Sequence, residues 1–140
     1  RIIVGEVRGA EALDMLQAMN TGHDGSLSTG HSNSTKDMLS RLETMVISGN
    51  SIPIEAIRQQ IASALDIIIQ LSRLRDKSRR TLEITEVVGY ENGAIRLNPL
   101  YRFVEHGETK DGRIIGGLER TENPLVHTYK FHMAGLSDQV

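Results

Sequence analysis

The chain has 140 residues, of which 39% are hydrophobic and 24% charged, an ordinary balance for a globular domain with a modest core. The formal net charge of -2 provides no bulk attraction to nucleic acid or to an anionic membrane, so no nucleic-acid partner is expected. The absence of Cys excludes disulfides, thiolate catalysis and Cys-based zinc sites. No apolar run approaches the roughly 18 residues that a membrane span requires.

The first half of the chain alternates strand and helix patterns. Residues 2–4 are apolar and β-branched, which is typical of a central strand in a parallel sheet. Helical spacing of apolar side chains predicts a helix over 10–20, and a second short strand is predicted over 26–30. Two more helices are predicted, one from a capping box at Ser34 to a stop at Gly49-Asn50 and one starting at Pro53. This order indicates a three-layer α/β fold over residues 1–66.

The second half, residues 67–140, has a β-rich pattern. Strands are predicted over 67–75 and 79–88, around a hairpin turn at 76–78. Asn92-Gly93 is a strong hairpin signal within residues 90–95. Residues 106–117 are polar and rich in Gly, and the strand signals after them are too weak to assign an order.

Glu6 follows the first predicted strand at its carboxyl end. In an open α/β sheet the ligand lies outside the carboxyl ends of the strands. A carboxylate at this place can contact a magnesium ion (Mg2+) through water, or orient the water that attacks a γ-phosphate, as a Walker B glutamate does. The alternative is an apolar strand that ends in Glu without any special role.

His31 follows the next predicted strand, within Thr29-Gly30-His31. Because neighbouring parallel strands end side by side, Glu6 and His31 are expected to face one crevice. An imidazole there can hydrogen-bond a phosphate oxygen and so detect the γ-phosphate. The alternative is an exposed loop histidine.

His23 lies at the end of the first predicted helix, in Thr21-Gly22-His23. The simpler interpretation is helix termination, with Gly22 ending the helix and His23 favouring the negative end of the helix dipole; a direct chemical role is the alternative. A two-His, one-carboxylate metal site made of Glu6, His23 and His31 is a further alternative, although their spacing matches no compact metal motif.

Four segments taken together are specific: Arg1-Ile-Ile-Val-Gly-Glu-Val-Arg-Gly, Asn20-Thr-Gly-His-Asp-Gly-Ser-Leu, Gly30-His-Ser-Asn-Ser and Ser40-Arg-Leu-Glu-Thr-Met-Val. In order and spacing they resemble the type II/IV secretion system (traffic) ATPase superfamily. Within it they are most similar to the ATPases of the tight-adherence (Flp) pilus assembly branch. The resemblance is close up to Gly89 and fades beyond it.

The resemblance implies a fold, an activity and a setting. The fold is α/β: a partial RecA-like P-loop NTPase core, with a parallel sheet and flanking helices, followed by a smaller antiparallel β region. Residues 1–66 would be the C-terminal part of that core, and 67–140 its β-rich remainder with a C-terminal extension. The family implies a homo-hexamer that hydrolyses ATP with Mg2+ to power pilus assembly or secretion. It would act in the cytoplasm, peripheral at the inner membrane, on inner-membrane platform proteins.

Individual residues match the family's motifs. Glu6 matches the Walker B glutamate, which contacts Mg2+, and His31 matches the His-box histidine, so these two are the expected catalytic residues. Arg8 matches the arginine just after Walker B, His23 lies in the segment leading into the His box, and Arg41 lies in the Arg-Leu-Glu-Thr-Met stretch. The last three are expected to bind or support the nucleotide site.

No Gly-x-x-x-x-Gly-Lys-Ser/Thr loop occurs in the sequence. Because Arg1 opens directly onto a strand without a Met, we expect a fragment that begins at Walker B. Because the loop that holds the phosphates is missing from it, we expect this fragment to be inactive alone. The family's four-cysteine metal site is also absent, which argues against the type II secretion branch. The alternative function is a non-hydrolysing ring or scaffold component of a secretion machine.

Overall fold

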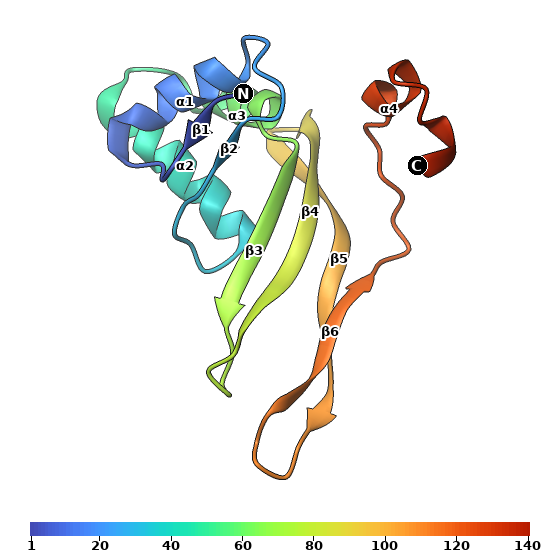
Figure 1. Cartoon of the computed structure of the whole chain (residues 1–140). Helices are drawn as coiled ribbons and strands as arrows, with labels where there is room; N and C mark the ends of the chain where they lie inside the picture. The colour runs from blue at the N-terminus through green and yellow to red at the C-terminus, as the bar shows by residue number, and fades with distance from the viewer. The chain divides into compact units, whose positions relative to one another are not determined.

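The computed structural model describes residues 1–140, and the chain divides into two compact units (Figure 1). The first comprises Arg1–Asp66 and Gly89–Arg96, and the second comprises Ile67–Val88 and Leu97–Val140. The predicted α/β class is confirmed, because a parallel strand pair with helices precedes a four-stranded antiparallel sheet. No helix combines the length and apolar character that crossing a membrane would require. The nucleotide-binding identity expected for residues 1–66 stays a prediction.

The parallel pair of the first unit consists of β1 (Ile3–Val4) and β2 (Leu27–Ser28), with Ile3 opposite Leu27. Backbone hydrogen bonds extend the pairing at both ends. Leu27 N donates to Ile2 O at 3.0 Å, and Val7 N donates to Thr29 O at 2.9 Å. The two strands predicted to be parallel neighbours are therefore neighbours, and they stay in register up to the residues that follow them.

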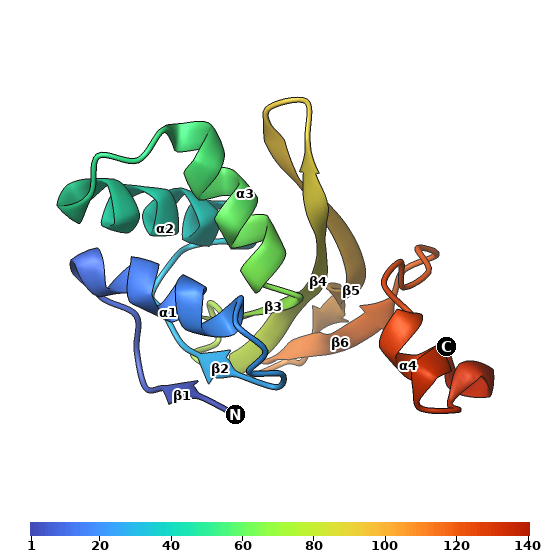
Figure 2. The same ribbon diagram turned by 90° about the horizontal axis from the view of Figure 1, so that it is seen from above.

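Three helices lie on one side of this pair (Figure 2). They are α1 (Ala12–Met19), preceded by the 3-10 turn η1 (Gly9–Glu11), α2 (Thr35–Gly49) and α3 (Ile54–Ala64). All three were predicted, with ends that differ by a few residues. Their apolar faces pack on one another and form the core of the unit, which includes Ala12, Met15, Leu16, Leu39, Leu42, Val46, Ile57 and Ile61.

The N-terminus of α2 has the predicted capping interactions. Ser34 Oγ accepts a hydrogen bond from Asp37 N at 3.0 Å. In return, the Asp37 carboxylate accepts a hydrogen bond from Asn33 N at 2.9 Å, one residue before the cap. At the start of α3, Pro53 is the N-cap residue, immediately before the first helical position.

The second sheet has the order β3-β4-β5-β6 (Figure 1). Its strands are β3 (Ile67–Arg73), β4 (Arg79–Glu91), β5 (Ala94–Glu108) and β6 (Ile114–Arg120). The two predicted hairpin turns are confirmed. The turn at residues 76–78 joins β3 to β4, and Asn92 and Gly93 join β4 to β5 with positive φ values of 53° and 80°. Strands β4 and β5 extend further than the sequence pattern indicated.

Strand β6 lies where the sequence pattern assigned no order. Its glycines weaken the strand signal in the sequence, but close packing requires a glycine at position 116. A Cβ at Gly116 would lie 2.3 Å from Val104 O and 3.1 Å from the Phe103 ring. Glycine therefore permits the close approach of β6 to β5 that places Gly116 opposite Glu105.

A C-terminal segment follows β6 and contains the short helices α4 (Tyr129–Met133) and η2 (Ser137–Gln139). It is tied to β4 by Glu86, which is only 2% exposed. The Glu86 carboxylate accepts hydrogen bonds from the backbone N–H groups of Val126 and His127, both at 2.9 Å. Burial raises the pKa of Glu86, but these two bonds and one from the Asn98 side chain outweigh that effect, so the pKa is lowered and the carboxylate stays charged.

Candidate functional site

Glu6 and His31 meet at the carboxyl edge of the parallel pair. Because Val7 N is bonded to Thr29 O, the residue before Val7 and the residues after Thr29 lie at the same edge. His31 Nε2 lies 2.8 Å from Glu6 Oε1. The predicted juxtaposition of these two side chains is confirmed; their catalytic roles remain a matter for proposal.

Arg8 holds the other oxygen of the same carboxylate. Its Nε donates to Glu6 Oε2 at 2.9 Å, and its Nη2 contacts the same oxygen. The hydrogen bond from Arg8 lowers the pKa of Glu6, and the charges of Arg8 and His31 act in the same direction against the opposing effect of burial. Glu6 is therefore ionised at neutral pH, and its side chain is 26% exposed, beside the more exposed Arg8 and His31.

The loop that carries His31 is fixed on two sides. Thr29 Oγ1 donates to Gly5 O at 2.5 Å, which fastens the loop to the end of β1. A Cβ on Gly30 would lie 2.9 Å from Met38 Cε and 3.3 Å from Val7 Cγ1, so glycine allows the loop to lie close to α2 and to the strand edge. Thr29 was assigned no role from the sequence, because its bond to Gly5 depends on the pairing of two strands.

Arg41 contacts the site only through other residues. Its Nε lies 3.3 Å from Asp37 Oδ2, and the same oxygen accepts the bond from Asn33 N just after His31. Arg41 can thus position the loop through Asp37. Asp37 was not among the predicted site residues, although its place in the capping box was the signal that could have found it.

His23 contacts the end of α1. Its Nδ1 lies 2.9 Å from Ala18 O and 3.3 Å from Thr21 Oγ1. A carbonyl oxygen can only accept, so Nδ1 carries the proton in this contact. These contacts agree with the helix-termination interpretation of His23.

The sequence profile of the family described as "Type II/IV secretion system protein" matches residues 1–112. The chain belongs to this family.

Several relatives share the family's segment. A Mycobacterium tuberculosis protein is 40% identical over 121 residues, which are 86% of this chain and 34% of that protein. "Conjugal transfer protein TrbB" of Rhizobium radiobacter is 40% identical over 92 residues, 66% of this chain and 27% of that protein. "Type IV secretion system protein PtlH" of Bordetella pertussis is 35% identical over 83 residues, 57% of this chain and 24% of that protein.

One solved structure is similar as well. It is the VirB11 ATPase of the Brucella suis type IV secretion system in complex with sulphate, with 30% identity and a TM-score of 0.58. The similarity covers 61% of this chain and 27% of that chain. The chain thus spans about a third or less of the length of the curated relatives it matches. Nothing in these likenesses tests the finer assignment to the tight-adherence pilus branch, which stays a prediction.

The alternative of a metal site made of Glu6, His23 and His31 is wrong. The structure contains no group of three or more His, Asp or Glu side chains that could hold a metal ion. His23 is engaged at the end of α1, so Glu6, His23 and His31 do not converge. The contact of Glu6 with Mg2+ stays a prediction; because both of its oxygens already accept hydrogen bonds, a contact through water would fit the geometry better than direct coordination.

Proposed function

We propose that the intact protein is an ATPase whose ATP hydrolysis powers secretion, conjugal transfer or pilus assembly. The observation that carries this proposal is the contact of Glu6 with His31 at the carboxyl edge of two parallel strands. Ligands of open α/β sheets bind at such an edge, and an ionised carboxylate with a neighbouring imidazole suits phosphoryl transfer. Family membership and the likeness to the VirB11 ATPase support the same activity.

In this proposal Glu6 is the Walker B glutamate and orients the attacking water. Arg8 lowers the pKa of Glu6, so the carboxylate stays ionised to a lower pH than it would without Arg8. His31 donates a hydrogen bond to a γ-phosphate oxygen, Arg41 positions the His31 loop through Asp37, and His23 supports the adjoining end of α1. When bound, Mg2+ neutralises charge on the phosphates.

The setting proposed for the intact protein follows from its family. We infer a homo-hexameric ring in the cytoplasm, peripheral at the inner membrane, that acts on inner-membrane platform proteins of a tight-adherence or related machine. Nucleic acid is not proposed as a partner, since the net charge of -2 provides no attraction to it.

The test is Glu6→Gln in the full-length protein, with Glu11→Gln as a matched control. Glutamine keeps the size of the side chain but loses the charge that orients water. Nucleotide binding should persist while the ATP hydrolysis rate falls by about 10²–10⁴-fold, as for loss of a general base. Glu11 is an exposed carboxylate of η1, so its replacement should leave the rate unchanged. Hydrolysis near the wild-type rate in Glu6→Gln would show that Glu6 is not the catalytic carboxylate. No hydrolysis by the wild type would favour a non-hydrolysing scaffold component.

A further inference from the structure

The hairpin that joins β3 to β4 carries an unusual density of positive charge. Residues 73–80 include one acidic and five basic side chains: Arg73, Arg75, Asp76, Lys77, Arg79 and Arg80. The whole chain is nevertheless slightly acidic, with a net charge of -2. The charge of the hairpin is therefore a local feature and not a consequence of overall composition.

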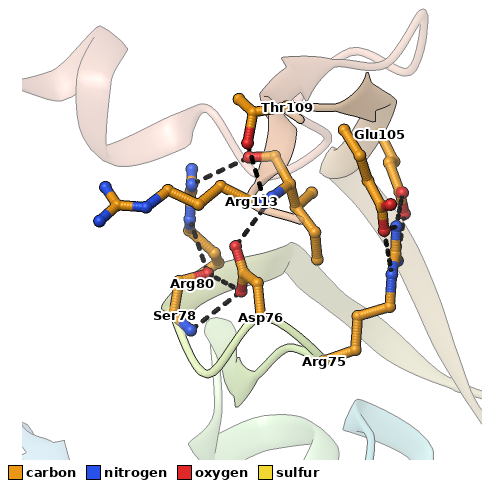
Figure 3. Close-up of polar contacts among 9 residues, drawn as sticks. Arg75, Asp76, Ser78, Arg80, Glu105, Thr109 and Arg113 are labelled. Carbon is orange, nitrogen blue, oxygen red and sulfur yellow. Dashed lines mark hydrogen bonds and ion pairs between the residues drawn. The ribbon is translucent and has the colours of Figure 1, made fainter. Parts of the chain in front are cut away.

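Two of the five cations have partners within the second unit (Figure 3). The Arg75 guanidinium donates to Glu108 Oε1 at 2.7 Å and to Glu105 Oε2 at 2.9 Å. Arg80 donates to Ser78 Oγ at 3.3 Å, and its Cζ lies 5.9 Å from the centre of the Phe103 ring. These two arginines are explained by the structure of the sheet.

The other three cations, Arg73, Lys77 and Arg79, are exposed and make no ion pair or hydrogen bond through their side chains. Arg73 and Arg79 are direct partners in the β3–β4 register, so they extend from the same face of the hairpin. Like charges directly opposite one another destabilise a β-ladder. The pair therefore weakens the hairpin in the absence of an anion.

Lys77 adds the third positive charge at a conformational cost. Its φ is +68°, a region that a residue other than Gly, Asn or Asp seldom adopts. The turn is nevertheless closed tightly, since Leu74 N donates to Ser78 O at 2.8 Å and Lys77 N donates to Leu74 O at 2.9 Å. Glycine would satisfy this backbone with less strain, so the sheet alone does not explain a lysine here.

The nearest acidic side chain is already committed elsewhere. Asp76 Oδ1 accepts from Ser78 N at 2.9 Å and from Ser78 Oγ at 2.5 Å, while Oδ2 accepts from Ile114 N at 2.9 Å (Figure 3). These bonds fix the turn and link it to the start of β6. Asp76 makes no ion pair with Arg73, Lys77 or Arg79, and its single negative charge does not balance their three positive charges.

We propose that Arg73, Lys77 and Arg79 form a binding site for a phosphate-bearing anion. Arg73 and Arg79 occupy directly opposed strand positions, and guanidinium N–H groups match phosphate oxygens in geometry; the lysine adds a point charge. Three unpaired cations suit a multiply charged phosphate better than a single carboxylate. The same chemistry is offered by a soluble polyphosphate and by an anionic lipid headgroup. The site does not depend on the proposed ATPase function.

The test is a calorimetric titration of the chain with inorganic tripolyphosphate, beside sedimentation with phosphatidylglycerol vesicles and with neutral phosphatidylcholine vesicles. The double variant Arg73→Gln/Arg79→Gln is compared with Lys110→Gln/Arg113→Gln, which removes the same charge from the β5–β6 turn. Hydrogen bonds to charged groups typically correspond to about tenfold in affinity each. The first variant loses two such charged donors and should therefore bind about 100-fold more weakly, and the second should bind within about twofold of the wild type. Selective binding of tripolyphosphate identifies a soluble ligand, and selective binding of phosphatidylglycerol vesicles identifies a headgroup.

Melting temperatures of the same samples distinguish a loss of binding from a loss of folding. Because removing the opposed like charges relieves repulsion, Arg79→Gln and the double variant should melt no lower than the wild type. A lower melting temperature would mean that the arginines stabilise the sheet, which overturns the proposal. Equal loss of binding in both double variants, no binding of either probe by the wild type, or tighter binding of a single-stranded oligonucleotide at equal phosphate concentration would overturn it as well.

Discussion

His31 Nε2 lies 2.8 Å from Glu6 Oε1, although the histidine side chain is 88% exposed. A carboxylate that is ionised can only accept, so Nε2 carries the proton in this contact and a neutral ring leaves Nδ1 as an acceptor. A phosphate oxygen that reaches this edge would compete with Glu6 for the Nε2 proton. The pair can therefore exchange one hydrogen bond for another when a nucleotide binds.

Replacing His31 by Ala in the full-length protein should lower the ATP hydrolysis rate strongly. Loss of one preorganised donor to a developing charge commonly costs about 10²–10³-fold in turnover. The proposed hexamer should stay assembled and the melting temperature should hardly change, because the imidazole is exposed. Measuring rate and melting temperature on one preparation decides between a catalytic histidine and a loop histidine. Unchanged turnover would assign His31 to the loop, and a large fall in melting temperature would remove the support for a catalytic role.

The matched control is His23→Ala. His23 Nδ1 is bound to Ala18 O at the end of α1, so its removal should lower the melting temperature slightly, with a much smaller effect on the hydrolysis rate than His31→Ala.

Replacing Arg8 by Gln should move the acidic limb of the pH–rate profile toward neutral pH. Arg8 lowers the pKa of Glu6, and a carboxylate that must be ionised loses activity as the pH falls through its pKa. Without Arg8 that pKa rises, so activity is lost at a higher pH. Arg41→Gln serves as the control, since Arg41 binds Asp37 and not Glu6. A profile whose acidic limb does not move in Arg8→Gln would show that Glu6 does not control it.

The central pair of the site was predictable, and the reason is topological. Parallel strands that follow one another along the chain end at one edge, so the residues after each strand, Glu6 and His31, had to be neighbours once both strands were identified. The supporting bonds were not predictable. Thr29 reaches Gly5, and Asp37 reaches Asn33, through distances of a few ångströms that depend on loop conformation and not on any periodic pattern.

The antiparallel region shows a similar limit. The turn at Asn92-Gly93 follows from the positive φ values that these residue types accept. Strand β6 escaped detection because Gly116 is required by the proximity of Val104 O, a constraint that arises only after the two strands are paired. The interaction of Glu86 with Val126 and His127 joins distant parts of the sequence, and no local pattern indicates it.

Replacing Asp76 by Asn should lower the stability of the second unit at neutral pH and remove part of its pH dependence. The hydrogen bond from the Ser78 side chain and those from the backbone of Ile114 and Ser78 lower the pKa of Asp76 from 3.8 to about 2. A lowered pKa stabilises the folded state fully above the ordinary value, and that contribution is lost as the pH falls from near 4 toward 2. Melting temperatures of the two proteins should therefore converge in this range. Curves that stay parallel down to pH 2 would contradict the assignment.

Replacing Glu86 by Gln should release the C-terminal segment from β4. The carboxylate accepts from two backbone N–H groups, one on each oxygen, and an amide would turn an N–H group toward one of those donors. For a side chain that is only 2% exposed, we expect a loss of about 2 kcal/mol or more. Hydrogen exchange should accelerate at the amides of Val126 and His127, and the melting temperature should fall.

The exposed Glu122 in the same segment supplies the control, because Glu122→Gln changes the charge equally and should leave both exchange and melting unchanged. The pH dependence provides a second check. Since the pKa of Glu86 is lowered from 4.5, the wild-type segment should stay protected above that pH and lose protection as the pH falls below it. In Glu86→Gln this transition should be absent. Slow exchange at Val126 and His127 in the variant would mean that other contacts hold the segment, and the role assigned to Glu86 would be wrong.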